Sequence, residues 1–144
     1  MLQDIATIDS KYKFFIERVV ASKLVWALKS KAGWANSSSV DNEEIDVIPF
    51  WSDRAYAKAC ARDDWKNYSA TEIPLAEFLE SWCAGMVENE TLVGTNWDAN
   101  MFGKESNALV AALDILNQLK KNNSTITFRD YGSIDEFITD ISEE

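Results

Sequence analysis

The sequence predicts an α+β fold in which helices pack against a small mixed or antiparallel sheet of about four or five strands. Two observations predict it. Short apolar runs typical of strands are interleaved with longer segments whose apolar residues recur at helical spacing. The chain has 144 residues, enough for one domain, and its seven Phe, six Trp and four Tyr can build a core without covalent staples. We therefore expect residues 1–144 to form a single domain.

The N-terminal third predicts a helix followed by a hairpin. Asp9 or Ser10 can cap a helix over about residues 10–22. The apolar stripe of this helix consists of Tyr12, Phe15, Ile16, Val19 and Val20. A strand over 24–29, a turn at 31–33 and a partner strand from Trp34 predict a hairpin. Residues 37–44 are polar and lack periodicity, so we expect a loop there.

Residues 46–53 predict the strand around which the fold is organised. The strand ends in two aromatic residues and leads into a helix over about 53–62. Because Pro49 cannot donate a ladder hydrogen bond, we expect this strand at a sheet edge or with a bulge. Ser52 stands where a helix N-cap belongs, with Asp53 in the first turn. The side of this helix expected to approach a sheet carries Ala55, Tyr56, Ala59 and Cys60.

A second strand-to-helix unit follows at residues 72–88. Its helix, over about 75–88, has an apolar face of Leu75, Phe78, Leu79, Trp82 and Met86. Residues 91–93 predict a short strand, 94–96 a turn and 98–103 irregular backbone. We expect the two aromatic-ended segments, 46–53 and 92–98, to lie side by side in the core.

The C-terminal part predicts two helices. The first runs from Glu105 or Ser106 to about Lys121, and its inward residues are Leu109, Ala112, Leu113 and Leu116. Residues 125–128 alternate like a short strand. Ser133 and Glu136 form a capping box that opens the last helix. The inward residues of that helix are Ile134, Phe137, Ile138 and Ile141.

Composition excludes several classes of function. The absence of histidine removes the commonest general base and metal ligand, and we predict no metal and no cofactor. Residues 1–70 contain equal numbers of acidic and basic side chains, so the net charge of −10 resides in residues 71–144. An acidic surface repels nucleic acid and anionic lipid and attracts a basic protein. With no long apolar run and no signal-like N-terminus, we expect a cytoplasmic protein, monomeric or homodimeric.

Cysteine usage agrees with a reducing compartment. Cys60 and Cys83 lie on different expected helices and belong to no CxxC pair. Two reduced, buried thiols are favoured, and a disulfide between them is the alternative.

An ordered set of short motifs resembles a known family. The motifs are Trp26-Ala27-Leu28, Gly33-Trp34-Ala35, Ile48-Pro49-Phe50-Trp51-Ser52-Asp53, Ile73-Pro74-Leu75 with Phe78-Leu79, and Val93-Gly94 with Asn96-Trp97-Asp98. Together they resemble the bacterial proteins grouped as DUF2750, over about residues 10–100. The resemblance implies a small bacterial cytoplasmic α+β domain and supplies no activity, substrate or catalytic residue. On this basis residues 10–103 form the family-like core and 104–144 a C-terminal helical extension.

Two hypotheses for function follow from these features. The first is a non-enzymatic binding protein, for example an acidic, immunity-type inhibitor of a basic protein. The alternative is a carboxylate-based enzyme or a small-ligand-binding protein with a site at the strand ends. The residues that would form this site are Trp51, Ser52, Asp53, Asn96, Trp97 and Asp98. The competing interpretation is that the polar members cap backbone ends and both tryptophans belong to the core. A third possibility is self-association through the C-terminal extension.

Overall fold

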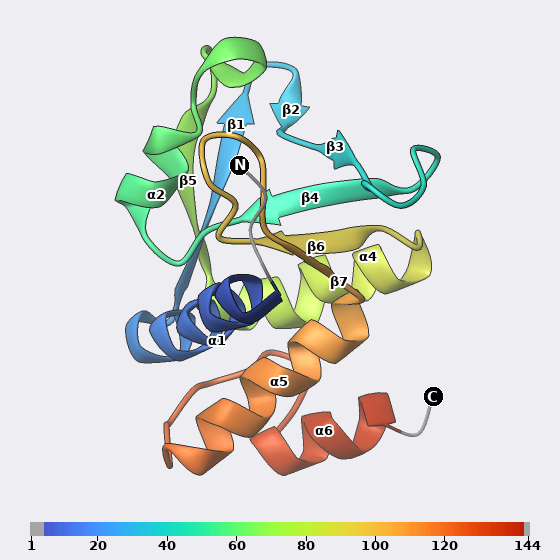
Figure 1. Cartoon of the computed structure of the whole chain (residues 1–144). Coiled ribbons are helices and arrows are strands. Elements are labelled where there is room, and N and C mark those ends of the chain that lie inside the picture. The colour runs from blue at the N-terminus through green and yellow to red at the C-terminus, as the bar shows by residue number, and fades with distance from the viewer. Residues whose placement is uncertain (1–4, 143–144) are drawn as a thin grey trace.

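The strands form two sheets that meet at one corner (Figure 1). A computed structural model describes residues 5–142, and side chains from residue 7 onward. One sheet has the antiparallel order β2-β1-β5, and the other has the mixed order β3-β4-β6-β7. The strands are β1 (Leu24–Ser30), β2 (Gly33–Trp34), β3 (Ser37–Ser38), β4 (Asp46–Phe50), β5 (Ser69–Pro74), β6 (Leu92–Thr95) and β7 (Lys104–Ser106). The α+β prediction is confirmed, with the strands divided between two sheets.

Strands β4 and β6 lie side by side, as predicted, and are parallel. Their register runs from Val47 opposite Leu92 to Phe50 opposite Thr95. Directly after β4, Trp51 exchanges two backbone hydrogen bonds of 2.8 Å with Trp26 of β1, which joins the two sheets. Because neighbouring strand residues face opposite sides, Phe50 and Trp51 enter two different hydrophobic clusters.

The expected edge position of Pro49 is wrong, since β4 lies between β3 and β6. Alternation of the backbone explains why proline is tolerated there. The Phe50 carbonyl accepts the N–H of Asn96, the residue after β6, whereas the N–H and carbonyl of Trp51 bond to Trp26 of β1 on the opposite side of β4. Backbone groups two residues apart in a strand point to the same side, so Pro49 faces the side of Trp51 and not that of β6. On that side Pro49 lies between Val47, which pairs with β3, and Trp51, which pairs with β1, so its missing N–H removes no bond to β6.

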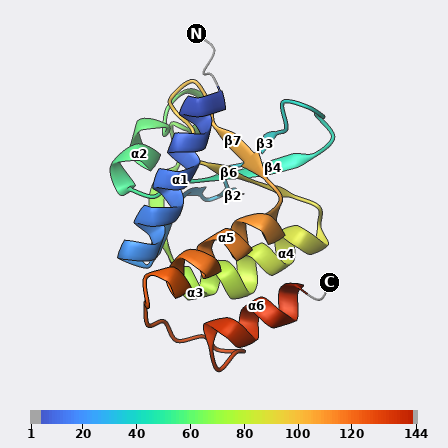
Figure 2. The ribbon, with the colours of Figure 1, turned by 60° about the horizontal axis from the view of Figure 1, so that its bottom comes forward.

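Most helices cover one face of the mixed sheet (Figures 1 and 2). A continuous helical segment, α3 to α4, contains a central π-helical turn, η2, and packs beside α5, while α6 lies on the far side of these helices from the sheets. Helix α2 instead packs against β1 and β5. The helical elements are α1 (Ile5–Ser22), α2 (Arg54–Ala59), the 3₁₀ turn η1 (Asp63–Trp65), α3 (Leu75–Glu77), η2 (Phe78–Trp82), α4 (Cys83–Glu88), α5 (Ala108–Lys121) and α6 (Ile134–Ser142).

Several expected details in the N-terminal half are wrong. Helix α1 already begins at Ile5, so Asp9 and Ser10 lie inside it. Residues 37–38 form the short strand β3. Helix α2 buries Ala57 and Cys60 and exposes the other predicted inward residues, Ala55, Tyr56 and Ala59. This helix is too short and too rich in alanine for its periodicity to identify the buried side.

The expected turn at 94–96 is partly strand, because Gly94 and Thr95 extend β6. Glu105 and Ser106, one of which was expected to begin a helix, belong to β7, and α5 begins after Asn107. The Asn107 side chain caps α5 by accepting the N–H groups of Leu109 and Val110. The buried residues of α5 are Ala108, Ala111, Ala112, Ile115, Leu116 and Leu119, so Leu109 and Leu113 are only half-buried.

One of the two hydrogen bonds of the expected C-terminal capping box forms, and the Glu136 side chain accepts the N–H of Gly132 in place of that of Ser133. The bond that forms is donated by the Glu136 N–H to Ser133 Oγ at 3.0 Å. Residues 125–128 are not a strand, but Phe128 is buried against Phe137 of α6 with ring centroids 5.0 Å apart. The remaining inward residues of α6, Ile134, Ile138 and Ile141, are half-buried as packing partners of the larger cluster.

One sequence expectation concerns a chain terminus. The expected absence of a secretory signal rests mainly on residues 1–4, which lie outside the described residues. The last two acidic residues, Glu143 and Glu144, also lie outside them. Within residues 5–142, no helix has the length and apolar character needed to cross a membrane.

Candidate binding site at the strand ends

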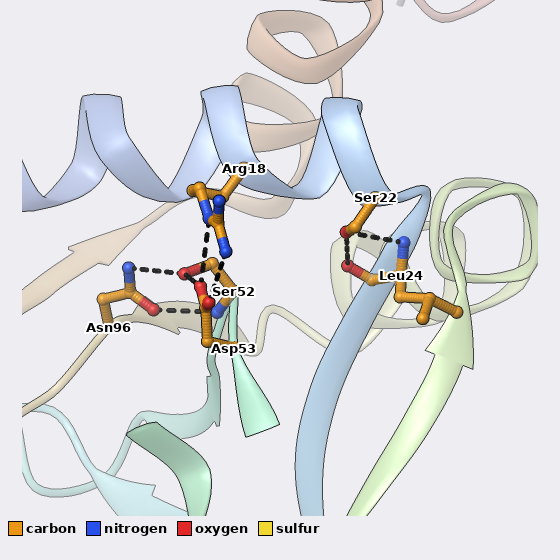
Figure 3. Close-up of polar contacts among 6 residues, drawn as sticks. All are labelled: Arg18, Ser22, Leu24, Ser52, Asp53 and Asn96. Atoms are coloured by element: carbon orange, nitrogen blue, oxygen red, sulfur yellow. Dashed lines mark hydrogen bonds and ion pairs between the residues drawn. The ribbon is translucent and has the colours of Figure 1, made fainter. Parts of the chain in front are cut away.

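Asn96 connects the ends of β4 and β6 (Figure 3). Its amide oxygen accepts the Ser52 N–H at 2.9 Å, and its amide nitrogen donates to Ser52 Oγ at 3.1 Å. Both residues are buried. Asn96 has φ +47, a left-handed conformation that asparagine tolerates better than most residues. The Asn96–Ser52 pair therefore satisfies the backbone of β4 where the chain turns into α2.

Asp53 extends this polar cluster to α1 (Figure 3). Its carboxylate accepts a hydrogen bond from the Ser52 hydroxyl at 2.7 Å and pairs with the Arg18 guanidinium at 2.6 Å. The Arg18 hydrogen bond lowers the pKa of Asp53 below its ordinary value, although partial burial opposes this shift. The N-cap of α2 is Asp53, not Ser52, and neither side chain bonds to the first turn of that helix. Asp53 thus fastens α1 to the end of β4.

The two tryptophans are core residues with satisfied indole N–H groups. Trp51 Nε1 donates to the Trp97 carbonyl at 2.9 Å, and Trp97 Nε1 donates to the Lys104 carbonyl at 3.2 Å. The Trp97 indole fits between Gly94 and Gly103, where an added Cβ would lie 2.6 and 2.3 Å from indole atoms. Glycine at both positions is therefore required for Trp97 to lie against β6.

Asp98 shapes the loop that follows Trp97. Its carboxylate accepts the N–H groups of Asn100 at 2.8 Å and Phe102 at 3.2 Å, while its own N–H donates to the Phe102 carbonyl. Asp53 and Asp98 thus have separate structural partners. The structure brings five of the predicted residues together at the strand ends as two adjacent hydrogen-bonded groups, Ser52 with Asp53 and Asn96, and Trp51 with Trp97, and Asp98 orders the adjoining loop.

A groove with a volume of about 710 Å³ opens beside this cluster, between α1 and α2. We call it the α1–α2 groove. Helix α1 contributes Thr7, Ser10, Lys11 and Phe14, α2 and its C-terminal end contribute Tyr56, Ala59 and Cys60, and the loop after β6 contributes residues 96–99. Three of the six predicted site residues, Asn96, Trp97 and Asp98, therefore line the groove, whereas Trp51 and Ser52 are buried and Asp53 is half-exposed outside the lining.

Sequence reasoning missed the aromatic wall of this groove. Phe14 and Tyr56 are 42% and 44% exposed, and their ring centroids lie 6.3 Å apart. Phe14 falls outside the apolar stripe of α1, and Tyr56 was expected to face a sheet. An aromatic residue on the polar side of an amphipathic helix was the available signal, because a large exposed apolar side chain is more informative than a buried one.

One thiol, that of Cys60, lies among the residues that line the groove. Burial raises the pKa of the Cys60 thiol. This thiol donates hydrogen bonds to the carbonyls of Trp97 and Asp98. A raised thiol pKa keeps the sulfur protonated and weakly nucleophilic. In the described part of the chain, no cluster of three acidic or cysteine side chains is arranged to hold a metal. Cys60 and Cys83 are both buried and free.

The fold and groove define a small α+β protein with an open, mainly apolar groove at the ends of two parallel strands. The chain belongs to the DUF2750 family, whose model, described as "Protein of unknown function (DUF2750)", matches residues 12–119. The family resemblance is thus confirmed, and the match also includes β7 and most of α5, which we expected to lie beyond it. Comparisons with curated proteins and with solved structures gave no match.

Proposed function

We propose that this protein is a non-enzymatic binding protein and that the α1–α2 groove is its ligand site. The observation that carries the proposal is a groove of about 710 Å³ at the strand ends, with two half-exposed aromatic side chains in its wall. Ligand sites typically have volumes of about 300–1,000 Å³ and mostly apolar walls with a few polar groups. The polar side chains of the adjacent cluster are engaged in structural hydrogen bonds, which favours binding over a carboxylate-based reaction.

The chemistry of the wall indicates the kind of ligand. Phe14, Tyr56 and Trp97 offer aromatic surface, and Lys11 is the cation among the described lining residues. An apolar or aromatic molecule that carries one anionic group would bury its body against the rings and direct its charge to Lys11. The proposed location is the bacterial cytoplasm, which agrees with two free, buried thiols.

Binding of a fluorescent aromatic sulfonate, 1-anilinonaphthalene-8-sulfonate, tests this proposal. The Ala59→Arg variant places a long side chain in the groove, and Ala55→Arg makes the same change on an exposed position of α2 outside the lining. We expect the fluorescence increase to be lost in Ala59→Arg and retained in Ala55→Arg. Equal binding to both variants and the unaltered chain would refute the groove as the ligand site.

The role of Lys11 has its own comparison. Replacing Lys11 with Met should weaken binding of the sulfonate but leave binding of the neutral analogue N-phenyl-1-naphthylamine unchanged. Equal weakening of both probes would mean that Lys11 acts through packing and not through its charge.

A second candidate function is binding of a basic protein, for example as an immunity-type inhibitor. The observation that favours it is the confinement of the net charge of −10 to residues 71–144. Charge complementarity accelerates association and selects partners of opposite sign. Retention of a basic model protein such as lysozyme on the immobilised chain, and its release by salt, would support this candidate. Absence of any salt-dependent retention would contradict it.

A further inference from the structure

Helix α6 lies next to α4 on the side of the helices remote from the sheets (Figure 2), and residues of both helices line a second groove. We call it the α4–α6 groove; its volume is about 370 Å³. Its apolar floor includes Val87, Phe137 and Ile141, and carboxylates surround it at Glu80, Glu88 and Asp140. Val87 is 37% exposed and Ile141 is half-exposed, so these two residues form the accessible part of the floor, whereas Phe137 is buried. This groove is small enough to hold one or two apolar side chains.

Two of the carboxylates at its rim accept hydrogen bonds from uncharged donors. Glu80 accepts the backbone N–H groups of Arg129 at 2.8 Å and Asp130 at 2.6 Å, and Asp140 accepts the Tyr131 hydroxyl at 2.6 Å. The donating groups are uncharged, while the guanidinium of Arg129 interacts electrostatically with Glu80 as well as with Asp130. At the margin, Arg129 pairs with Asp130 at 3.4 Å, and both side chains are largely exposed. Among the described residues that line the groove, none is Lys or Arg.

Two helix C-termini lie at this groove, and so does the first turn of α5 through Leu109, where the partial charge of the helix has the opposite sign. Glu88 ends α4 and Asp140 lies in the last turn of α6, and neither helix has a basic residue in its last turn. The usual arrangement places cations there, because the C-terminus of a helix carries a partial negative charge. Helix α5 follows that rule with Lys120 and Lys121. Within the described residues, neither α4 nor α6 has a basic side chain that complements its C-terminus, so a cationic group of a partner would find favourable electrostatic interactions there.

We propose that the α4–α6 groove binds a basic amphipathic segment of a partner protein. One or two apolar side chains of that segment would lie on Val87 and Ile141, and its Lys or Arg side chains would face Glu80, Glu88 and Asp140. The inference rests on the second candidate function and adds the binding surface and the chemistry of the occupant. Nucleic acid, anionic lipid and a second copy of this acidic groove would all meet like charge.

The test uses a fluorescein-labelled 14-residue peptide of Lys and Leu arranged as an amphipathic helix. Its counterpart has Glu in place of Lys. Fluorescence anisotropy is measured with the full chain, with the groove variants Val87→Lys and Glu88→Lys, and with the matched variants Val40→Lys and Glu43→Lys. The matched positions lie in the exposed loop before β4, outside the groove lining. Circular dichroism verifies that each variant is folded.

We expect the Lys/Leu peptide to bind the unaltered chain and the Glu/Leu peptide not to bind. Each groove substitution should weaken binding at least about tenfold, and each matched substitution less than about twofold. Equal weakening by groove and matched variants would overturn the groove as the site while leaving a diffuse acidic attraction intact. Absence of peptide binding would overturn the groove proposal, and the lysozyme experiment then decides separately whether the second candidate function stands.

Discussion

Replacing Asn96 with Ala should destabilise the fold more than any exposed substitution. The change leaves the buried Ser52 N–H without its 2.9 Å acceptor, which costs about 1–3 kcal/mol. It also places alanine at φ +47, a left-handed conformation that costs about 1–2 kcal/mol for an ordinary residue. We therefore expect a loss of about 2–5 kcal/mol, a large part of the stability of a typical domain.

The Asn96→Gly variant separates the two contributions. Glycine removes the same hydrogen bonds but adopts positive φ at little steric cost, so it should recover about 1 kcal/mol relative to Ala. Urea denaturation followed by tryptophan fluorescence gives both values. A loss below about 1 kcal/mol for Asn96→Ala would refute the structural role of the Asn96–Ser52 pair. Equal losses for Ala and Gly would refute the contribution of backbone conformation.

Three further predictions concern Gly103, Asp53 and the two thiols. Gly103→Ala should destabilise the fold by about 1–3 kcal/mol, because the added Cβ would overlap the Trp97 indole. Gly85→Ala is the matched change in α4, where an added Cβ meets no atom within 4 Å, and thermal denaturation should show it to be stabilising by about 0.5–1 kcal/mol. Because the pKa of Asp53 is lowered in the folded state, its contribution is present above its ordinary value of 3.8 and is lost as the pH falls through the lower, folded-state value. Asp53→Asn should therefore make acid destabilisation less steep. Both thiols should resist Ellman's reagent at pH 8 in the folded chain and react fully in denaturant, since burial raises their pKa; rapid labelling of the folded chain would contradict this.

The central part of the fold could be predicted because its sequence signals are strong and local. Residues 46–50 and 92–95 are short apolar runs that end at polar or turn-forming residues, and the structure pairs them in parallel. The capping box at Ser133 likewise depends on two side chains three positions apart. The long helix at 75–88 has a clear apolar periodicity that survives even its π-helical turn.

The missed elements depend on tertiary context. Strands β3 and β7 have two and three residues and become strands only because β4 and β6 offer them free edges. The position of Pro49 inside a sheet depends on which side its nitrogen faces, and this cannot be read from one strand alone. The buried face of α2 is selected by its position against β1 and β5, because its own alanines fit either side.

The candidate site shows the same division between local and tertiary signals. Aromatic and polar residues at two strand ends resemble a reactive pocket in the sequence, yet Ser52, Asp53 and Asn96 have structural partners there. The accessible surface beside them comes instead from Phe14 and Tyr56, on helices that precede and follow β4. No segment alone identifies that surface, because each aromatic residue is unremarkable until α1 and α2 face each other across the groove. Hydrogen bonds at the ends of β4 and β6 fix the base on which α1 and α2 present apolar surface, and a rigid base of this kind is what the proposed binding site requires.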